Sequence, residues 1–260
     1  MLGLGGGTIL VPLLIFLLGV PIHIASGASI VAVVATSSAA AISYVRDEMT
    51  NMRLGMFLEL ATTLGAVTGA FLVSVVSEST LRVIFGLSLL YASGTMYLQS
   101  RRMERSWAHR PNDALADRLE LGGSYFDSTR NETITYGVGN TPKTMVVSYF
   151  AGIVSGLLGI GGGGIKVPAM NSIAGIPMKV AVATSNFMIG VTAAASAFVY
   201  LRHGYCNAFV TAPVVLGALL GAFVGARLIR HVRGVDIKRM FVFILLVLGL
   251  RMILSGVWLV

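Results

Sequence analysis

The sequence contains few charged residues. Only 12% of its 260 residues are Asp, Glu, Lys or Arg, and 55% are hydrophobic, whereas a soluble domain carries roughly 25% charged residues. A chain with so few charged side chains lacks the polar surface that a water-soluble fold needs, and its mean hydropathy of +0.83 agrees with this. The composition therefore predicts an integral membrane protein whose surroundings are the lipid bilayer.

Cysteine and enzyme motifs are also scarce. Cys206 is the single cysteine, which excludes an intramolecular disulfide framework and disfavours a metal site. The sequence has no HExxH, GxSxG or P-loop pattern, and its four histidines lack ligand spacing. We therefore predict no catalytic residue, no cofactor and no metal. The excess of 19 Lys and Arg over 11 Asp and Glu is explained by cytoplasmic loops, and we predict no nucleic-acid partner.

What the sequence holds instead is a series of apolar runs. Several approach the roughly 20 residues that cross hydrocarbon as a helix, so the predicted fold class is an all-α multi-pass membrane protein. Residues 101–143 are too polar to enter the bilayer, and they separate a first transmembrane repeat (1–100) from a second (144–260). Within this loop, 124–127 and 133–138 are expected to form a small hairpin. The apolar runs fall at about 2–18, 24–45, 54–76, 81–99, 145–174, 178–201, 207–229 and 237–259.

The two apolar halves repeat each other. When Pro12 is aligned with Pro168, an offset of 156 residues, positions 3–46 match without a gap and 16 of 44 are identical. Composition alone would give roughly four identities, so the match indicates an internal duplication. Because Met1 aligns with Leu157, the first half is expected to lack the half-helix that precedes the glycines of the second half.

The Lys and Arg positions predict how the halves are oriented. If every apolar run crosses the bilayer, the halves are parallel and the basic residues divide 10 to 7 between the two faces. If the Gly-rich first segment of each half instead enters and returns on one side, each half has three crossings, the halves are inverted, and the division is 15 to 2. The positive-inside rule favours the second arrangement and places 101–143 in the cytoplasm. Inverted repeats with broken helices are typical of secondary transporters.

Each half carries a glycine-rich motif, which reads GLGGGTILVP at 3–12 and GIGGGGIKVP at 159–168. Consecutive glycines reach backbone conformations that are closed to other residues, and N–H groups at the start of a half-helix favour an anion. We therefore predict that a substrate binds between the two glycine breaks. The alternative is that the glycines merely allow close packing. The glycines predicted to bind substrate are Gly5, Gly6, Gly7, Gly161, Gly162, Gly163 and Gly164.

Polar side chains are predicted for the same site. A lysine at mid-membrane depth, as Lys166 would be, is unfavourable unless it faces an aqueous path or a counter-ion, so Lys166 is predicted to attract an anionic substrate. A lysine that snorkels or pairs structurally is the alternative. Ser29, Ser185 and Asn186 follow the two breaks, and they could replace part of an oxyanion's hydration shell or hydrogen-bond between helices.

Three further polar residues in the apolar runs indicate function less clearly. For Thr36 and its counterpart Thr192, an interhelical hydrogen bond is the preferred interpretation, because Ser and Thr commonly serve that role in membranes. Glu59 could relay a proton. Its place only about 9 Å along a helix from Arg53 is nevertheless more typical of a carboxylate near the membrane interface, and that interpretation is preferred.

The duplicated glycine motif resembles the TauE/SafE sulfite exporter family, also called the toluenesulfonate uptake permeases. So do ATSNFMIGVTAAASAFVY at 183–200 and its counterpart beginning at Ala28. The resemblance covers nearly the whole chain. It implies a multi-pass transporter of a bacterial or archaeal plasma membrane that exports sulfite, sulfonates or related organosulfur anions by alternating access. An uncoupled, channel-like anion pore and an uptake permease for a related organic anion stay open, as do proton coupling and homo-oligomerisation.

Overall fold

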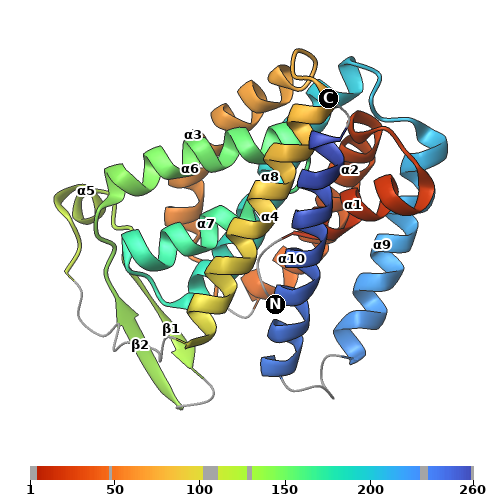
Figure 1. Cartoon of the computed structure of the whole chain (residues 1–260). Coiled ribbons are helices and arrows are strands. Elements are labelled where there is room, and N and C mark those ends of the chain that lie inside the picture. The colour runs from red at the N-terminus through yellow and green to blue at the C-terminus, as the bar shows by residue number, and fades with distance from the viewer. Residues whose placement is uncertain (1–4, 47–48, 102–110, 128–130, 229–233, 259–260) are drawn as a thin grey trace.

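The computed structural model of the chain describes residues 5–46, 49–101, 111–127, 131–228 and 234–258 (Figure 1). Six helices in this described part are long and apolar enough to cross a membrane, which confirms the predicted all-α multi-pass fold class. They are α2, α3, α4, α8, α9 and α10. The elements in chain order are α1 (Gly7–Leu18), α2 (Ile22–Arg46), α3 (Met52–Leu72), α4 (Glu78–Arg101), α5 (Ala114–Arg118), β1 (Gly123–Asp127), β2 (Glu132–Tyr136), α6 (Thr141–Leu158), α7 (Gly163–Ala169), the π-helix η1 (Met170–Ala174), α8 (Met178–Arg202), α9 (Ala208–Leu228) and α10 (Gly234–Val257).

The offset of 156 residues found in the sequence runs through every helix that the halves share. The bounds of α2 and α3 fall on those of α8 and α9. The connections repeat as well. Gly19 ends α1 and Gly175 ends η1, both in the left-handed conformation that glycine adopts without strain, with φ of 64° and 78°. At the next turn, the side chains of Asn51 and Asn207 accept hydrogen bonds from backbone N–H groups at the starts of α3 and α9. The duplication therefore extends to the backbone.

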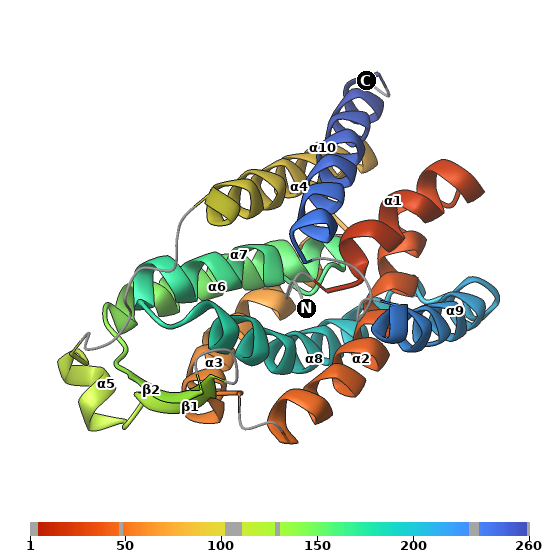
Figure 2. The same cartoon turned by 90° about the horizontal axis from the view of Figure 1, so that it is seen from below.

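Counterpart helices pack against each other. α2 lies along α8, and α4 lies along α10, as Figure 2 shows. α3 packs on α8, and its counterpart α9 packs on α2 in the same way. Such reciprocal pairs are what two halves related by a two-fold axis would form. The inverted orientation of the halves across a membrane stays a prediction.

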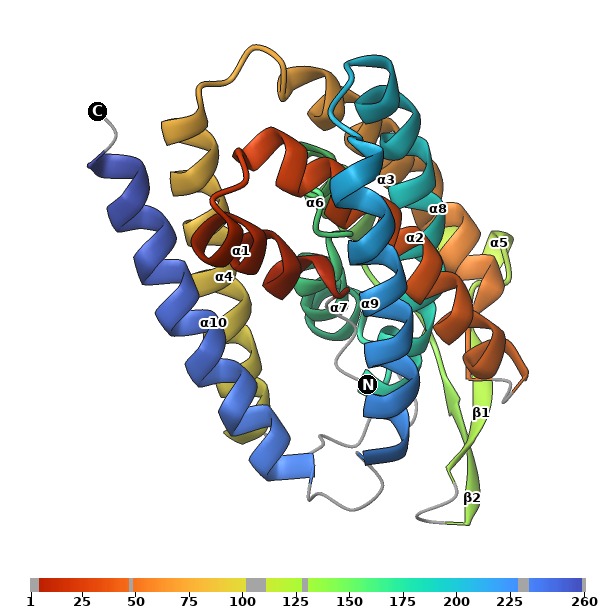
Figure 3. The ribbon, with the colours of Figure 1, turned by 90° about the vertical axis from the view of Figure 1, so that its right-hand side faces the viewer.

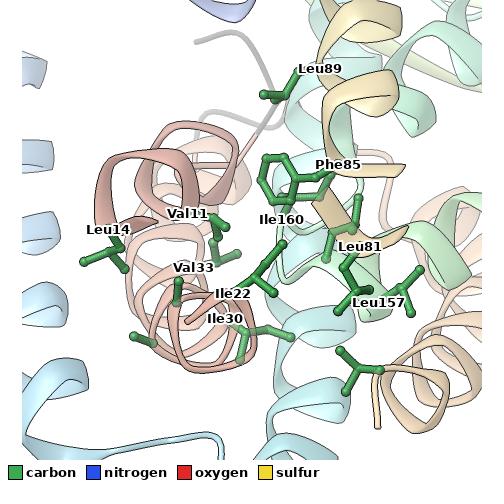
Figure 4. Close-up of a cluster of buried hydrophobic side chains, with 14 of the residues drawn as sticks. Val11, Leu14, Ile22, Ile30, Val33, Leu81, Phe85, Leu89, Leu157 and Ile160 are labelled. Carbon is green, nitrogen blue, oxygen red and sulfur yellow. The ribbon is translucent and has the colours of Figure 1, made fainter. Parts of the chain in front are cut away.

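The main hydrophobic core joins the two halves. Val11 and Ile30 from the first half gather with Leu157 and Ile160 from the second, and Phe85 of α4 closes the cluster (Figure 4). In water, burying a large apolar side chain of this kind stabilises the folded state relative to one in which the side chain is exposed. Between transmembrane helices the same contacts act mainly through van der Waals packing. The core therefore fixes α1 and the glycine break of the second half against each other.

One helix pair packs through small residues. On α3, a Cβ atom added to Gly65 or Gly69 would overlap backbone carbonyl oxygens of α6, so the two backbones approach as closely as glycine allows. The counterpart glycines on α9 are Gly221 and Gly225, where an added Cβ would meet no described atom within 4 Å. Figure 3 shows α9 on the outside of the molecule. The same sequence pattern therefore packs against a helix in the first half and is uncovered in the second.

This difference gives a matched pair of substitutions. Gly69→Ala should destabilise the protein by about 1–3 kcal/mol or more, because the methyl group meets fixed backbone. Gly225→Ala should be neutral or stabilise it by up to about 1 kcal/mol, since alanine has the higher helix propensity. Thermal unfolding of the purified protein in detergent measures both. An equal loss of stability at Gly225 would show that α9 packs its glycine face against another helix.

The central loop is folded and attached to the helix ends. β1 and β2 pair antiparallel from Gly123↔Tyr136 to Asp127↔Glu132, which confirms the predicted hairpin. Asp113 accepts hydrogen bonds from the Thr141 backbone N–H and side-chain hydroxyl, at 2.6 and 3.0 Å, at the start of α6. Desolvation raises the pKa of this carboxyl, but its hydrogen bonds outweigh that effect and hold the pKa below its usual value.

Two further contacts join the loop to both halves. Asn51, at the start of α3, donates to the Leu121 carbonyl at 2.8 Å, and Lys179, at the start of α8, forms a 2.7 Å ion pair with Asp127. Lys179 thus lies on the same side of the helices as the loop. The arrangement with eight crossings puts them on opposite faces, so the contact favours the re-entrant arrangement. Six of the fifteen basic residues on the predicted cytoplasmic face lie outside the described residues, namely Arg102, Arg105, Arg110, Arg130, Arg230 and Arg233.

The orientation can be tested by labelling single cysteines in a Cys206→Ala background. Ser124 in the hairpin and Ser77 before α4 are both exposed, and the inverted arrangement places them on opposite sides of the membrane. In sealed cells a membrane-impermeant thiol reagent should therefore label Ser77→Cys, whereas Ser124→Cys should react only after the membrane is permeabilised. Labelling of both from outside would contradict a cytoplasmic loop.

Candidate functional site

The long apolar run of the second half is a broken helix. α6 ends at Leu158, α7 begins at Gly163, and the backbone between them has positive φ at Gly159, Gly161 and Gly162, of 70°, 79° and 70°. Other residues rarely adopt these angles. The interruption predicted from the sequence is therefore confirmed, and it places Lys166 within the short helix that follows. In the first half, Gly5 has the matching φ of 76°, and Gly3 lies outside the described residues.

The two glycine breaks touch each other. A Cβ on Gly7 would lie 2.6 Å from the carbonyl oxygen of Gly159, and a Cβ on Gly5 would lie 2.8 Å from that of Ile160. Ser29 also spans the halves, since its hydroxyl donates to the Gly159 carbonyl at 3.0 Å. At Gly5 and Gly7, close packing thus accounts for the absence of a side chain. Their predicted role as backbone donors to an anion stays a prediction.

The remaining predicted glycines lie in two environments. Gly6 is exposed, whereas Gly161 is buried and a Cβ there would lie 2.7 Å from the Ile189 side chain. Gly162 accepts the first backbone hydrogen bonds of α7 through its carbonyl. Gly163 and Gly164 form the first turn of that helix. These glycines therefore have different structural roles: Gly161 packs against a neighbouring side chain, Gly162 to Gly164 begin α7, and Gly6 is exposed.

Lys166 is fully buried, with 0% of its surface exposed. Its ammonium group donates a 2.7 Å hydrogen bond to the Thr192 hydroxyl on α8 and lies 3.8 Å from Oε2 of Glu59 on α3. A buried ammonium ion is strongly unfavourable unless its charge is balanced. The carboxylate that balances it comes from the first half of the chain, whereas Lys166 comes from the second.

Glu59 is buried as well, with 6% of its surface exposed. Its Oε1 accepts hydrogen bonds from Thr192 at 2.6 Å and from Thr63 at 2.9 Å. Its Oε2, which faces Lys166, has no hydrogen-bond partner among the described residues. The interpretation of Glu59 as an interfacial carboxylate was therefore wrong, because α3 packs this position against α8. The hydrogen bond expected between helices at Thr192 is confirmed, and it links the two charges.

The other polar residues predicted from the sequence form no described hydrogen bond with Lys166 or Glu59. Ser185 is buried without a hydrogen-bond partner for its hydroxyl among the described residues. Asn186 donates to the Val182 carbonyl of its own helix at 3.1 Å. Thr36 donates to the Ala32 carbonyl at 2.9 Å, also within its own helix, so the interhelical hydrogen bond preferred for Thr36 was wrong. In the described part of the chain, no hydrogen bond joins Ser185 or Asn186 to Lys166. The structure thus groups Lys166 with a different set of side chains, which are Glu59, Thr63 and Thr192.

This charged cluster breaks the symmetry of the repeat. At the offset of 156 residues, Glu59 corresponds to Val215 and Lys166 corresponds to Leu10. The halves share a backbone, but only one of the two equivalent places carries charges. Both departures from the repeat are charged, and their signs are opposite. The sequence does carry a signal for this pairing, because each of the two charges stands in an apolar run at a position where the other repeat has an apolar residue.

Taken together, six membrane-length helices in two repeats, a glycine-broken segment and a buried ion pair between the halves define a multi-pass membrane protein built like a secondary transporter. Comparison with known proteins specifies the family. The family model described as "Sulfite exporter TauE/SafE" matches residues 1–252. The chain belongs to this family, and it is a membrane transporter of the TauE/SafE type.

Several relatives carry the same kind of name. "Probable membrane transporter protein YunE" of Bacillus subtilis (strain 168) is 25% identical over 99% of this chain and 93% of its own length. A "Probable membrane transporter protein" of Xylella fastidiosa (strain Temecula1 / ATCC 700964) is 28% identical over 88% of this chain and 78% of its own. "Sulfite exporter TauE/SafE family protein 6" of Arabidopsis thaliana is 36% identical over 35% of this chain and 22% of its own. No solved structure matches the chain.

Proposed function

We propose that this transporter exports a small organosulfur oxyanion, such as sulfite or a sulfonate, across the plasma membrane of a bacterium or archaeon by alternating access. The observation that carries the proposal is Lys166, a fully buried cation in the segment that follows the glycine break. A desolvated ammonium ion attracts an oxyanion much more strongly than an exposed one does. Family membership supports the substrate class, since the family is described by sulfite export.

The origin of the cluster supports alternating access. Glu59 belongs to α3 of the first half, whereas Lys166 and Thr192 belong to α7 and α8 of the second. Any rocking of one half against the other therefore changes the distance between the two charges. In transporters built from inverted repeats, the substrate site lies between the halves for the same reason.

Replacing Lys166 tests the proposal directly. Lys166→Met keeps the length of the side chain and removes its charge, and it should weaken binding of sulfite or methanesulfonate by ten- to a hundred-fold, which corresponds to about 1.5–3 kcal/mol. Lys166→Arg should retain part of the affinity, because the charge survives while its geometry changes. Thermal stabilisation of the purified protein by each anion measures binding.

Two control variants separate binding from folding. Lys166→Met leaves Glu59 buried without its counter-ion, which destabilises a fold by about 3–5 kcal/mol. The double variant Lys166→Met/Glu59→Gln should recover stability without recovering anion binding. Lys143→Met removes an exposed lysine and should bind as the unmodified protein does. If Lys166→Met binds the anion with unchanged affinity, the lysine is structural and the proposed site is wrong.

Flux measurements distinguish the transporter from an uncoupled, channel-like pore. In liposomes, a carrier that rocks between two states should show saturable sulfite flux, and anion on the opposite side should accelerate exchange of labelled substrate. A continuous pore shows neither saturation of this kind nor counterflow. Flux that rises linearly with concentration and is unaffected by anion on the other side would contradict alternating access.

A further inference from the structure

We propose that Glu59 couples the anion to a proton. In the empty transporter its carboxylate neutralises Lys166, and when the substrate anion takes that place beside Lys166, Glu59 binds one proton. The inference rests on the proposed role of Lys166 as the cation that binds the anion. Under this inference the protein transports a proton as well as the anion, the ratio is one proton to one anion, and Glu59 is the residue that carries the proton.

The balance of charge within the cluster leads to this conclusion. Lys166 and Glu59 are both buried, and their charged atoms lie 3.8 Å apart, so the empty cluster has no net charge. If an anion joined it while Glu59 stayed ionised, two negative charges would share one positive charge away from water. Such an arrangement is strongly unfavourable, and a buried carboxylate beside a like charge takes up a proton instead. With Glu59 protonated, Lys166 and a monovalent anion, such as a sulfonate or the singly protonated form of sulfite, again form a neutral pair.

The geometry of the carboxylate shows where the proton would bind. Oε1 already accepts hydrogen bonds from Thr63 and Thr192, whereas Oε2 faces Lys166 without a hydrogen bond from any described residue. The proton therefore adds to Oε2, and the carboxylate becomes a neutral carboxylic acid. No other bond forms or breaks. A protonated carboxyl is a hydrogen-bond donor, so the Oε2 hydroxyl can donate to an oxygen of the anion at Lys166.

Among the described residues, Lys166 is the one titratable group that contacts the Glu59 carboxylate through an ion pair or hydrogen bond. The helices that pack on α3 are α6 and α8, and α7 contributes Lys166. Within the described residues, Lys166 is the one charged group within ion-pair distance of Glu59, and the groups that hydrogen-bond to it are threonine hydroxyls. The remaining described Lys, Arg and Tyr residues on α6 and α8 are Lys143, Tyr149, Lys179, Tyr200 and Arg202.

The same charge balance explains how uncoupled movement would be prevented. The empty cluster and the cluster holding both proton and anion are neutral, whereas a cluster holding only one of them is charged. A net charge in the membrane interior is unfavourable. We therefore expect the halves to move relative to each other only when the cluster is neutral, that is, when it is empty or holds both the proton and the anion. Proton and anion then move together in one direction. The flow is outward when the anion is concentrated inside, and an acidic exterior opposes it.

The experiment uses methanesulfonate, because a sulfonate is the anion of a strong acid and keeps its single charge at every pH of the titration. Its affinity for the purified full chain should fall about tenfold per pH unit once the empty site has lost its proton. Binding in weakly buffered solution should take up one proton per anion, and calorimetry in two buffers of different ionisation enthalpy counts it. This count on the unmodified protein does not require any variant to fold.

Variants assign the proton to its residue. The assignment uses a Lys166→Arg background, because a guanidinium keeps its charge at every pH used, whereas a buried lysine without its counter-ion would itself gain and lose a proton. Lys166→Arg alone should take up a proton with the anion. Lys166→Arg/Glu59→Gln, in which glutamine imitates the protonated side chain, should bind methanesulfonate with an affinity that does not change with pH and without proton uptake. Glu59→Asp keeps a carboxylate and should retain the pH dependence. Glu120→Gln removes an exposed carboxylate in the central loop and should behave as the unmodified protein does.

The outcomes separate this inference from the proposed function. If methanesulfonate binds through Lys166 but takes up no proton, or if Lys166→Arg/Glu59→Gln keeps the pH dependence of Lys166→Arg, the coupling is wrong and the anion site stands. If neither methanesulfonate nor sulfite binds to the unmodified protein at any pH, both are overturned. Proton uptake that persists in Lys166→Arg and in Glu120→Gln but disappears in Lys166→Arg/Glu59→Gln would establish the coupling.

Discussion

A cation buried among membrane helices requires a counter-charge, and in this protein that requirement links segments far apart in the chain. Lys166 follows the glycine break of the second half, while Glu59 lies on α3 of the first, and the Thr192 hydroxyl contacts both. The ion pair between Lys166 and Glu59 therefore stabilises the arrangement of the two halves in which these residues lie close together. A change in the charge of either residue alters the energy of that position, which connects ionisation to the arrangement of the helices.

The glycines of the duplicated motif position the two halves through close backbone packing, whereas Lys166 and Glu59 join them through charge. Gly5 and Gly7 allow the first half to rest directly on the carbonyl groups of Gly159 and Ile160. Side chains there would hold the halves apart and shift Lys166 relative to α3. The duplicated motif thus sets a contact between backbones, and this contact places a charged residue from one half near its partner in the other.

Much of this architecture was predictable because it depends on patterns that a single sequence displays. The low charge content gave the fold class, the offset between Pro12 and Pro168 gave the repeat, and the glycine run beginning at Gly159 gave the helix break. The partner of Lys166 was not found in the same way. Glu59 lies close in sequence to Arg53, and that local spacing suggested an interface, whereas its burial depends on how α3 packs against α8.

The spacing of small residues along a helix also did not predict which helix would pack against it. The pattern around Gly65 and Gly69 recurs at Gly221 and Gly225, and small residues at this spacing allow a second helix to approach closely at both places. Only the first pair does so in the described structure, since α6 lies against it. A small-residue pattern shows that a helix can be approached, but which helix approaches depends on the tertiary fold.

The folded central loop has a consequence for movement. Through Asn51 and Lys179 it holds the first turns of α3 and α8, one from each half, and through Asp113 it holds the start of α6. Contacts that join helices at one end limit their separation more at that end than at the other. Displacements between the halves should therefore be small beside the loop and grow with distance from it. The wider of the two openings would then form on the side of the molecule opposite the loop.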